Sequence, residues 1–184
     1  MERAEALSLL NEHLKNANLV KHCLATEAIM RSLAERLGED ADLWGLAGLL
    51  HDLDFERTKD TPEQHTLQTL EILKNYDLPQ ELLQAIKAHN AEALGIERRS
   101  AFDFALAAAE TITGLIVACA LVQPDKKLAS VKPESVIKKM KKKDFARNVN
   151  RDIIRECEKL GMSLDEFVRL SLEAMRNITD ELGL

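Results

Sequence analysis

Hydrophobic residues recur along most of this chain at intervals of three and four positions, which is the spacing of an amphipathic α-helix. Leu7, Leu10 and Leu14 show this spacing near the start of the chain, and Leu82 and Ile86 show it near the middle. The helices that the pattern predicts cover residues 2–16, 18–37, about 40–52, 61 onward, 79–89, 101–121, 144–160 and 163–182. The segments between them, including residues 53–60 and 90–100, are predicted to be loops.

Residues that start and stop helices lie where the pattern breaks. Gly38 suits the left-handed position that follows a helix, and Asp40 or Asp42 can cap the next one. Residues 61–64, Thr-Pro-Glu-Gln, have the order of an N-cap, a first-turn proline and a capping-box partner. They predict a helix that begins at Thr61 and carries His65 in its first turn.

Composition supports a helical fold. Aromatic residues make up 4% of the 184 residues, and only seven glycines and four prolines interrupt the chain. This composition favours the all-α class over a sandwich or barrel. The chain has the length of one domain, and no linker divides residues 1–184.

The formal net charge of −6 gives no overall attraction to nucleic acid or to an anionic membrane. We expect no apolar run to reach a membrane-spanning length, and the charged start of the chain does not resemble a signal peptide, so a cytoplasmic protein is predicted. Cys23, Cys119 and Cys157 lie far apart and are predicted to be reduced packing thiols. The lysines of residues 126–143 are interpreted as a solvated helix face rather than a nucleic-acid site, because no aromatic residue interleaves them.

The segment Leu46–Asp54 carries the most informative chemistry. An apolar run there ends in His51 and Asp52, and Asp54 follows. A buried imidazole and a buried carboxylate both need partners, and one divalent metal ion satisfies both. Ordinary polar groups at a helix end would give the same local sequence.

Three further histidines lie at helix ends or on inward stripes. His22 shares a stripe with apolar residues of its helix, His65 falls near the predicted helix start at Thr61, and His89 ends an apolar stripe. A satisfied core histidine or an exposed first-turn histidine would fit the same positions. His13, the fifth, is interpreted as a surface or capping residue.

Glu110 is the second anomaly. It lies in the most apolar predicted helix, on the same stripe as Leu106 and Val117, so it is expected to be buried and to need a cation or a proton. Together with the four histidines and Asp52 it gives six donors without a thiolate. Such donors select Fe, Mn, Co, Ni or Zn, and their number favours two bridged ions.

The order His22, His51-Asp52, His65, His89 and an acidic residue at 110 resembles the HD superfamily of metal-dependent phosphohydrolases. The resemblance covers roughly residues 18–122. It implies a helical bundle in which His22, His51, Asp52 and Glu110 are core metal ligands, His65 and His89 serve a second ion, and Asp52 bridges. Residues 123–184 resemble the C-terminal helical extension of a bacterial and archaeal branch of that superfamily. The family normally has Asp where this chain has Glu110, which lengthens the arm of that carboxylate.

The function that this resemblance implies is hydrolysis of a phosphomonoester or phosphodiester, with a nucleotide-like substrate, by metal-activated water. Asp52 is then catalytic, and Asp54 and Glu56 are candidates for positioning water or protonating the leaving group. Either of the last two could equally orient a ligand histidine. Candidate contacts to a small phosphorylated substrate are Arg57, Lys59 and Asn90.

Two alternatives stay open. Some proteins of this fold use two irons and O₂ to oxidise a substrate, and a site that has lost catalysis could still bind a metal or a ligand. The sequence also leaves open the substrate, the metal and the oligomeric state, a homo-oligomer included.

Overall fold

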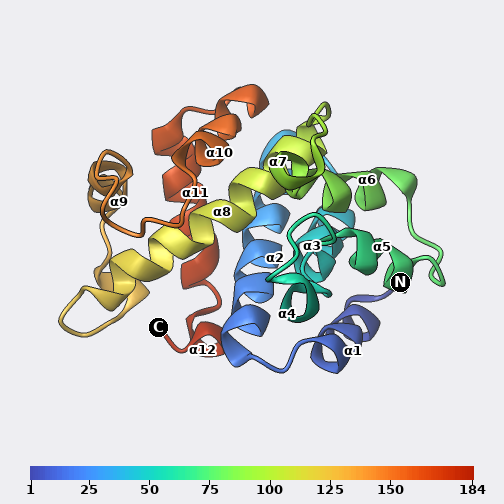
Figure 1. Cartoon of the computed structure of the whole chain (residues 1–184). Helices are drawn as coiled ribbons and strands as arrows, with labels where there is room; N and C mark the ends of the chain where they lie inside the picture. The colour runs from blue at the N-terminus through green and yellow to red at the C-terminus, as the bar shows by residue number, and fades with distance from the viewer.

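The computed structural model describes all residues, 1–184, and every regular element in it is a helix (Figure 1). The prediction of an all-α fold is thereby confirmed. In chain order the elements are α1 Arg3–His13, α2 Ala17–Leu37, α3 Ala41–Leu50, α4 Phe55–Thr58, α5 Leu67–Leu73, α6 Gln80–His89, α7 Ala91–Leu94, α8 Ala101–Leu121, η1 Leu128–Ser130, α9 Pro133–Met140, α10 Arg151–Arg155, η2 Glu156–Leu160, α11 Leu164–Arg176 and α12 Thr179–Leu182.

Helix α2 lies at the centre of the bundle and packs against α3, α8 and α11. Its contact with α3 is unusually close at Gly48, where an added Cβ would lie 2.8 Å from the Glu27 backbone. Only a glycine fits there, because real Cβ atoms do not approach a backbone so closely. The contact brings the C-terminal part of α3 against the middle of α2.

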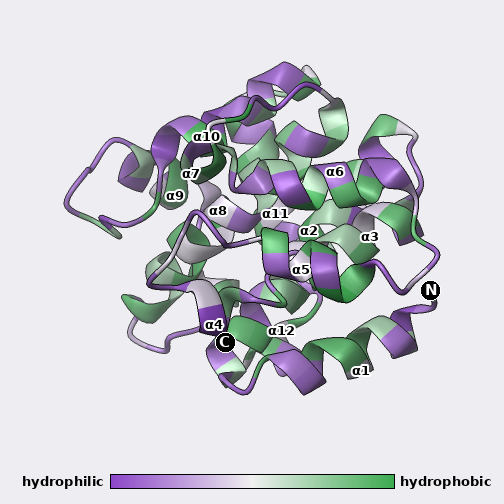
Figure 2. Cartoon of the chain, turned by 45° about the vertical axis from the view of Figure 1, so that its right-hand side comes forward, coloured by the Kyte–Doolittle hydropathy of each residue, from purple (hydrophilic) through white to green (hydrophobic).

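Helix boundaries follow local signals where the chain is exposed. Gly38 ends α2 in the left-handed conformation with φ 77°, and Asp40 caps α3 by accepting hydrogen bonds from two backbone N–H groups. Ser163 and Glu166 form a capping box at the start of α11. Figure 2 shows hydrophilic and hydrophobic residues sharing the same helices, as the spacing of the sequence requires.

Helix α8 crosses the bundle and is almost wholly apolar. By length and composition alone it could span a membrane, so the expectation that no segment reaches that length is wrong. However, 67% of its most apolar window is buried inside the fold. The core helix of a folded protein passes the same test, and α8 packs against α2, α6 and η2.

Several predicted boundaries are wrong. The predicted loops at 53–60 and 90–100 contain the short helices α4 and α7, and residues 144–150 form turns before α10 rather than a helix. Residues 61–66 also form turns, and α5 begins only at Leu67. Thr66, with φ 74°, has a backbone conformation that a helix does not allow.

The cysteines and lysines lie as expected. All three cysteines are buried and free, and burial raises the pKa of Cys119 to about 11 and that of Cys157 to about 12. The lysines of residues 126–143 are exposed apart from Lys139, which is half-buried and has its Nζ atom 4.0 Å from the ring centre of Phe145. Their exposure fits the interpretation as a solvated face.

Candidate metal centre

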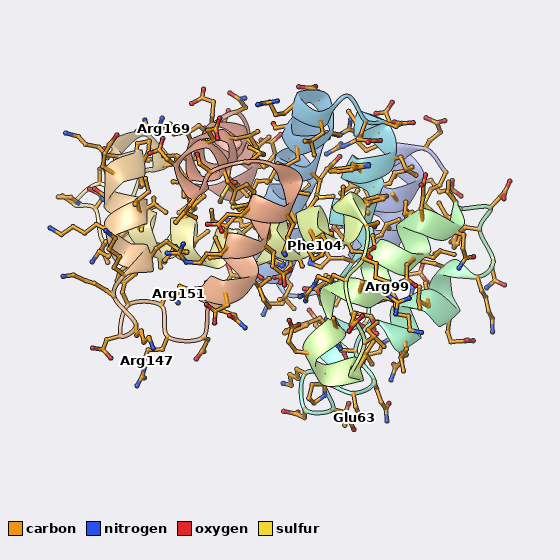
Figure 3. All side chains as sticks on the ribbon, turned by 90° about the horizontal axis from the view of Figure 1, so that it is seen from above. Glu63, Arg99, Phe104, Arg147, Arg151 and Arg169 are labelled. Carbon is orange, nitrogen blue, oxygen red and sulfur yellow. The ribbon has the colours of Figure 1, made fainter.

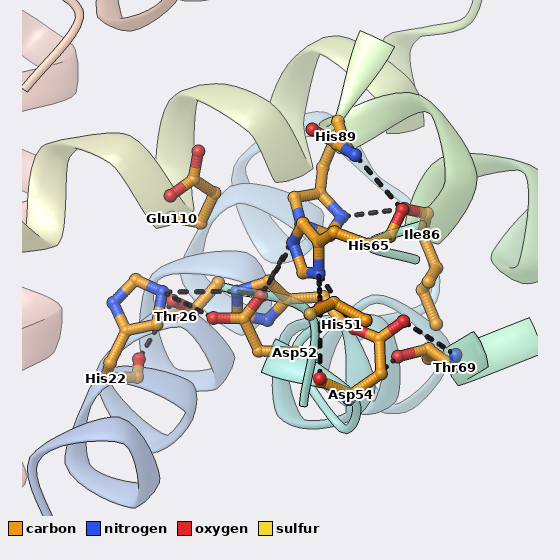
Figure 4. Close-up of polar contacts among 12 residues, drawn as sticks. His22, Thr26, His51, Asp52, Asp54, His65, Thr69, Ile86, His89 and Glu110 are labelled. Atoms are coloured by element: carbon orange, nitrogen blue, oxygen red, sulfur yellow. Dashed lines mark hydrogen bonds and ion pairs between the residues drawn. The ribbon is translucent and has the colours of Figure 1, made fainter. Parts of the chain in front are cut away.

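Four histidines from four different parts of the fold converge on one carboxylate, that of Asp52 (Figure 4). His22 comes from α2, His51 follows α3, His65 lies in the turn before α5, and His89 ends α6. Their Nε2 atoms lie 3.3–3.6 Å from the carboxylate oxygens of Asp52. The structure therefore brings together five of the six predicted metal donors.

These donors form two groups that share Asp52. One group is His22, His51 and Asp52, and the other is Asp52, His65 and His89, with the donor atoms of each group within 4.8 Å of one another. In each group the two imidazoles also face each other, since the Nε2 atoms are 3.1 Å apart in both pairs. One shared carboxylate between two histidine pairs is the arrangement expected of two bridged ions.

The second nitrogen of every ring is already engaged. Nδ1 of His51 bonds to the carbonyl of Gly48 at 2.8 Å, and Nδ1 of His89 bonds to the carbonyl of Ile86 at 2.6 Å. A carbonyl can only accept, so both rings carry their proton on Nδ1 and present a free lone pair on Nε2. Metal-ligating histidines commonly donate their other ring N–H to a carbonyl in this way.

His22 and His65 follow the same rule through side chains. The Thr113 hydroxyl donates to the carbonyl of Glu110 at 2.6 Å, so its oxygen accepts from Nδ1 of His22 at 2.8 Å. Nδ1 of His65 donates to the Asp54 carboxylate at 2.7 Å. All four rings are thus fixed with Nε2 directed at Asp52.

The electrostatics of the cluster favour a cation. Burial lowers the pKa of His22 and His51 to about 4 and also lowers that of His89, so these rings are neutral near pH 7. Burial would lower the pKa of His65 too, but hydrogen bonds to Asp52 and Asp54 raise it to about 9. Positive charge is therefore stabilised here even on an imidazole.

Asp52 is the negative centre of this cluster. Burial alone would raise the pKa of its carboxyl, but the nearby imidazoles, first His51 and then His65, His89 and His22, hold that pKa well below its usual range. An ionised carboxylate faced by converging imidazole lone pairs is costly to bury without a cation. The donor set consequently fits divalent transition-metal ions.

Glu110, the sixth predicted donor, is placed differently. Its carboxylate accepts a hydrogen bond from the Thr111 hydroxyl and is turned away from Asp52 in Figure 4. It belongs to neither donor group, although it lines the same cavity. Its surroundings, chiefly by desolvation, raise the pKa of Glu110 to about 8. Glu110 thus lies beside the cluster. It is half-buried, whereas the sequence predicts a buried residue.

Asp54 has an orienting position. It is fully buried, and its two carboxylate oxygens accept from Nδ1 of His65 and from the Thr69 backbone N–H at 3.0 Å. Both oxygens are therefore used to hold His65 and the start of α5. Of the two roles considered for Asp54, this placement supports orientation of a ligand histidine.

The other residues considered for catalysis or substrate contact fall in different places. The Glu56 carboxylate accepts from the backbone N–H groups of Lys15 and Asn16 and does not line the cavity, so its placement supports a structural role. Arg57 and Lys59 are exposed and lie outside the cavity lining. Asn90 does line the cavity, and its amide also donates to the carbonyl of His65 at 3.0 Å.

A cavity of about 560 Å³ opens over the donors. Besides the predicted residues it is lined by Phe55 of α4 and, from the C-terminal part of the chain, by Asn148, Asn150 and Ile153. None of these four residues was predicted from the sequence. The basic and polar character of residues 123–150 gave no sign that this segment returns to the metal donors, because the return depends on packing against α8.

The fold and the site together define a helical protein with a candidate metal centre made of histidines and a carboxylate. Residues 19–121 match the HD domain family, a match that covers more than half of the chain. The chain belongs to the HD domain family. This match confirms the resemblance to the HD superfamily that the order of histidines and acidic residues indicates.

Curated relatives share the name Ribonuclease Y. The protein of that name from Sulfurovum sp. (strain NBC37-1) is 27% identical over 168 residues, which are 90% of this chain and 32% of the relative. Ribonuclease Y from Aliarcobacter butzleri (strain RM4018) is 36% identical over 84 residues, 46% of this chain and 16% of the relative. The chain thus spans about a third or less of the length of these relatives. No solved structure matches the chain.

Proposed function

We propose that this protein is a metal-dependent phosphohydrolase that cleaves a phosphate ester with water. The observation that carries the proposal is the convergence of four Nε2 atoms on Asp52, in a chain of the HD domain family. Relatives named as ribonucleases support hydrolysis, since a ribonuclease breaks phosphate-ester bonds. No feature of the site favours the oxygenase alternative over hydrolysis.

In this proposal His22, His51, Asp52, His65 and His89 hold two ions of Fe, Mn, Co, Ni or Zn, with Asp52 shared between them. When bound, such ions lower the pKa of water towards 7 and offset negative charge on phosphoryl oxygens. A small phosphorylated molecule of the cytoplasm would be the substrate.

The residues of the chain contribute orientation. The Nδ1 hydrogen bonds to Gly48, Ile86, Thr113 and Asp54 fix the four rings, so little reorganisation accompanies binding. Asn90 ties the turn that carries His65 to the end of α6, which keeps the second histidine pair in register. Asn90 also lines the cavity and can donate to a phosphate or ester oxygen.

The test is an assay of metal-stripped protein reloaded with each metal, with p-nitrophenyl phosphate and bis(p-nitrophenyl) phosphate as substrates. Release of nitrophenolate should require the metal and should disappear in Asp52→Ala. Asp144→Ala is the matched control, because Asp144 is exposed and lines no part of the cavity. Absence of hydrolysis with all five metals would overturn the proposal, and iron-dependent O₂ uptake would favour the oxygenase alternative.

A further inference from the structure

Two cavities meet at His22. The first is the cavity over the metal donors, and the second has a volume of about 410 Å³. Both are lined by His22, Thr113 and Gly114. Because Nδ1 of His22 donates to the Thr113 hydroxyl, these two shared residues hold each other in place. Of the metal donors, only His22 lines the second cavity.

Most residues that line the first cavity are polar, and its acidic residues have no lysine or arginine beside them in the lining. None of the residues that line it is a lysine or an arginine, whereas Glu92 and Glu110 are acidic. Its remaining polar wall is made of amides and hydroxyls, from Asn90, Asn148, Asn150, Thr111 and Thr113. A phosphate bound here meets no basic side chain beyond the donors themselves.

The second cavity differs in character. Its walls include apolar side chains of α2, α8 and the C-terminal segment, and Lys21 is its one basic residue. Val117 and Leu121 lie one and two turns after Thr113 on α8, and Leu121 is 52% exposed. An apolar space of this kind beside a polar centre suits an aromatic or otherwise apolar group of a ligand.

These features match the chemistry of a phosphodiester. A phosphomonoester carries up to two negative charges at the phosphate and one organic group, whereas a phosphodiester carries one charge and two organic groups. Two spaces that share His22 can take two organic groups, and the absence of lysine and arginine around the first cavity matches a single charge on the phosphate.

We propose that the second cavity is a subsite of the metal centre, which receives the apolar or aromatic group on one side of a phosphodiester while the other group lies in the first cavity. The assignment rests on the proposed hydrolase function and adds to it the class of substrate. His22 separates the two groups, and Lys21 is available to a polar atom at the outer end of the second group.

The experiment compares three substrates on the manganese-loaded protein: bis(p-nitrophenyl) phosphate, methyl p-nitrophenyl phosphate and p-nitrophenyl phosphate. The wild-type protein should prefer the first diester to the monoester by about tenfold or more in kcat/KM. Val117→Trp fills the second cavity and should lower kcat/KM for bis(p-nitrophenyl) phosphate about tenfold, while leaving the methyl diester within about twofold.

Val122→Trp is the matched control, because Val122 is 60% exposed and lines neither cavity. It should leave all three substrates unchanged. If Val117→Trp does not fold, Leu121→Trp fills the outer part of the same cavity from a more exposed position. Equal effects on both diesters, no effect, or a preference for the monoester would overturn the subsite.

A binding measurement separates this inference from the proposed function. Diphenyl phosphate should bind the manganese-loaded wild-type protein, and Val117→Trp should weaken that binding about tenfold, as measured by calorimetry. Binding with this sensitivity but no hydrolysis of any ester would contradict the hydrolase function and leave the subsite in place. Hydrolysis together with insensitive binding would contradict the subsite alone.

Discussion

At the scale of single residues, the site depends on which nitrogen each histidine presents. The five clustered donors could be predicted from sequence, because His22 and His89 lie on inward stripes and His51-Asp52 ends an apolar run. The groups that accept from Nδ1 could not be predicted from sequence. The Gly48 and Ile86 carbonyls accept these hydrogen bonds because of how the rings of His51 and His89 are turned at the ends of their helices. The sequence left two possible roles for Asp54. The structure shows that its carboxylate accepts hydrogen bonds from His65 and from the Thr69 backbone N–H.

Glu110 gives a prediction at this scale. Its carboxyl group lies in the cavity but outside both donor groups, so it should support the ions from beside the ligands rather than as a ligand. Glu110→Gln should therefore weaken metal binding by about ten- to a hundredfold, as an outer-shell group does, in a competition titration. A loss as complete as that in Asp52→Ala would instead place Glu110 among the ligands.

At the scale of elements, the turn of residues 61–66 shows why a local motif fails. Thr61-Pro62-Glu63-Gln64 has the residues of a helix start, yet α5 begins only at Leu67. A helix from Thr61 could not keep His65 on Asp54 together with the left-handed Thr66, and the structure has both. The buried bond to Asp54 outweighs a weak local propensity, and strain of this kind is common at functional sites.

The close contact between α2 and α3 supports a second prediction. Gly48→Ala puts a Cβ 2.8 Å from backbone atoms of Glu27, so the helices must separate. We expect a loss of about 1–3 kcal/mol in the free energy of unfolding and weaker metal binding, because His51 follows α3 directly. Urea unfolding and a metal titration measure the two effects.

Gly45→Ala is the control for this change. The Cβ at position 45 meets only the Arg31 side chain, at 2.8 Å from its Nε, and that side chain can move. Its effect on both measurements should be clearly smaller than that of Gly48→Ala. Equal effects would show that closeness of the two backbones is not what positions His51.

Arg151 organises the wall that the sequence analysis missed. Its guanidinium donates to the carbonyls of Phe145, Ala146 and Val149, and Figure 3 shows it beside Arg147 on this part of the chain.

Arg151→Ala should free the loop, lower kcat/KM for a phosphate ester about tenfold and leave metal content unchanged. Arg147→Ala, at an exposed position, should change neither, and a fall in metal content of Arg151→Ala would contradict this role.

At the scale of the whole molecule, the C-terminal extension closes the site. The sequence resemblance divides the chain into residues 18–122 and an extension, and this division gave no reason to expect cavity residues beyond position 122. In the structure, Asn148, Val149, Asn150 and Ile153 line the cavity, and Val149 lies against Gly114 of α8. Such long-range packing has no periodic signal in the sequence, so helix prediction alone could not find it.

The pH dependence of stability is a property of the whole metal-free protein. His22 and His51 have folded-state pKa values of about 4, below the ordinary 6.5, so the unfolded chain binds more protons and stability falls as the pH drops from 6.5 to 4. The raised pKa of His65, about 9, has the opposite sign, and its contribution is lost as the pH rises from 6.5 to 9. The urea midpoint should therefore be highest near pH 6.5, and His22→Gln should flatten the acid side. A midpoint that stays level from pH 6.5 to 4.5 would contradict the buried, neutral state of these rings.

The most direct test of the metal centre is the metal content of purified protein after loading with excess manganese or iron, measured by elemental analysis for the wild-type chain and for Asp52→Ala. Because both donor groups share Asp52, we predict close to two ions per wild-type chain and close to none in the variant. His89→Ala, which removes a donor from one group only, should hold about one. Full metal content in Asp52→Ala would contradict the account.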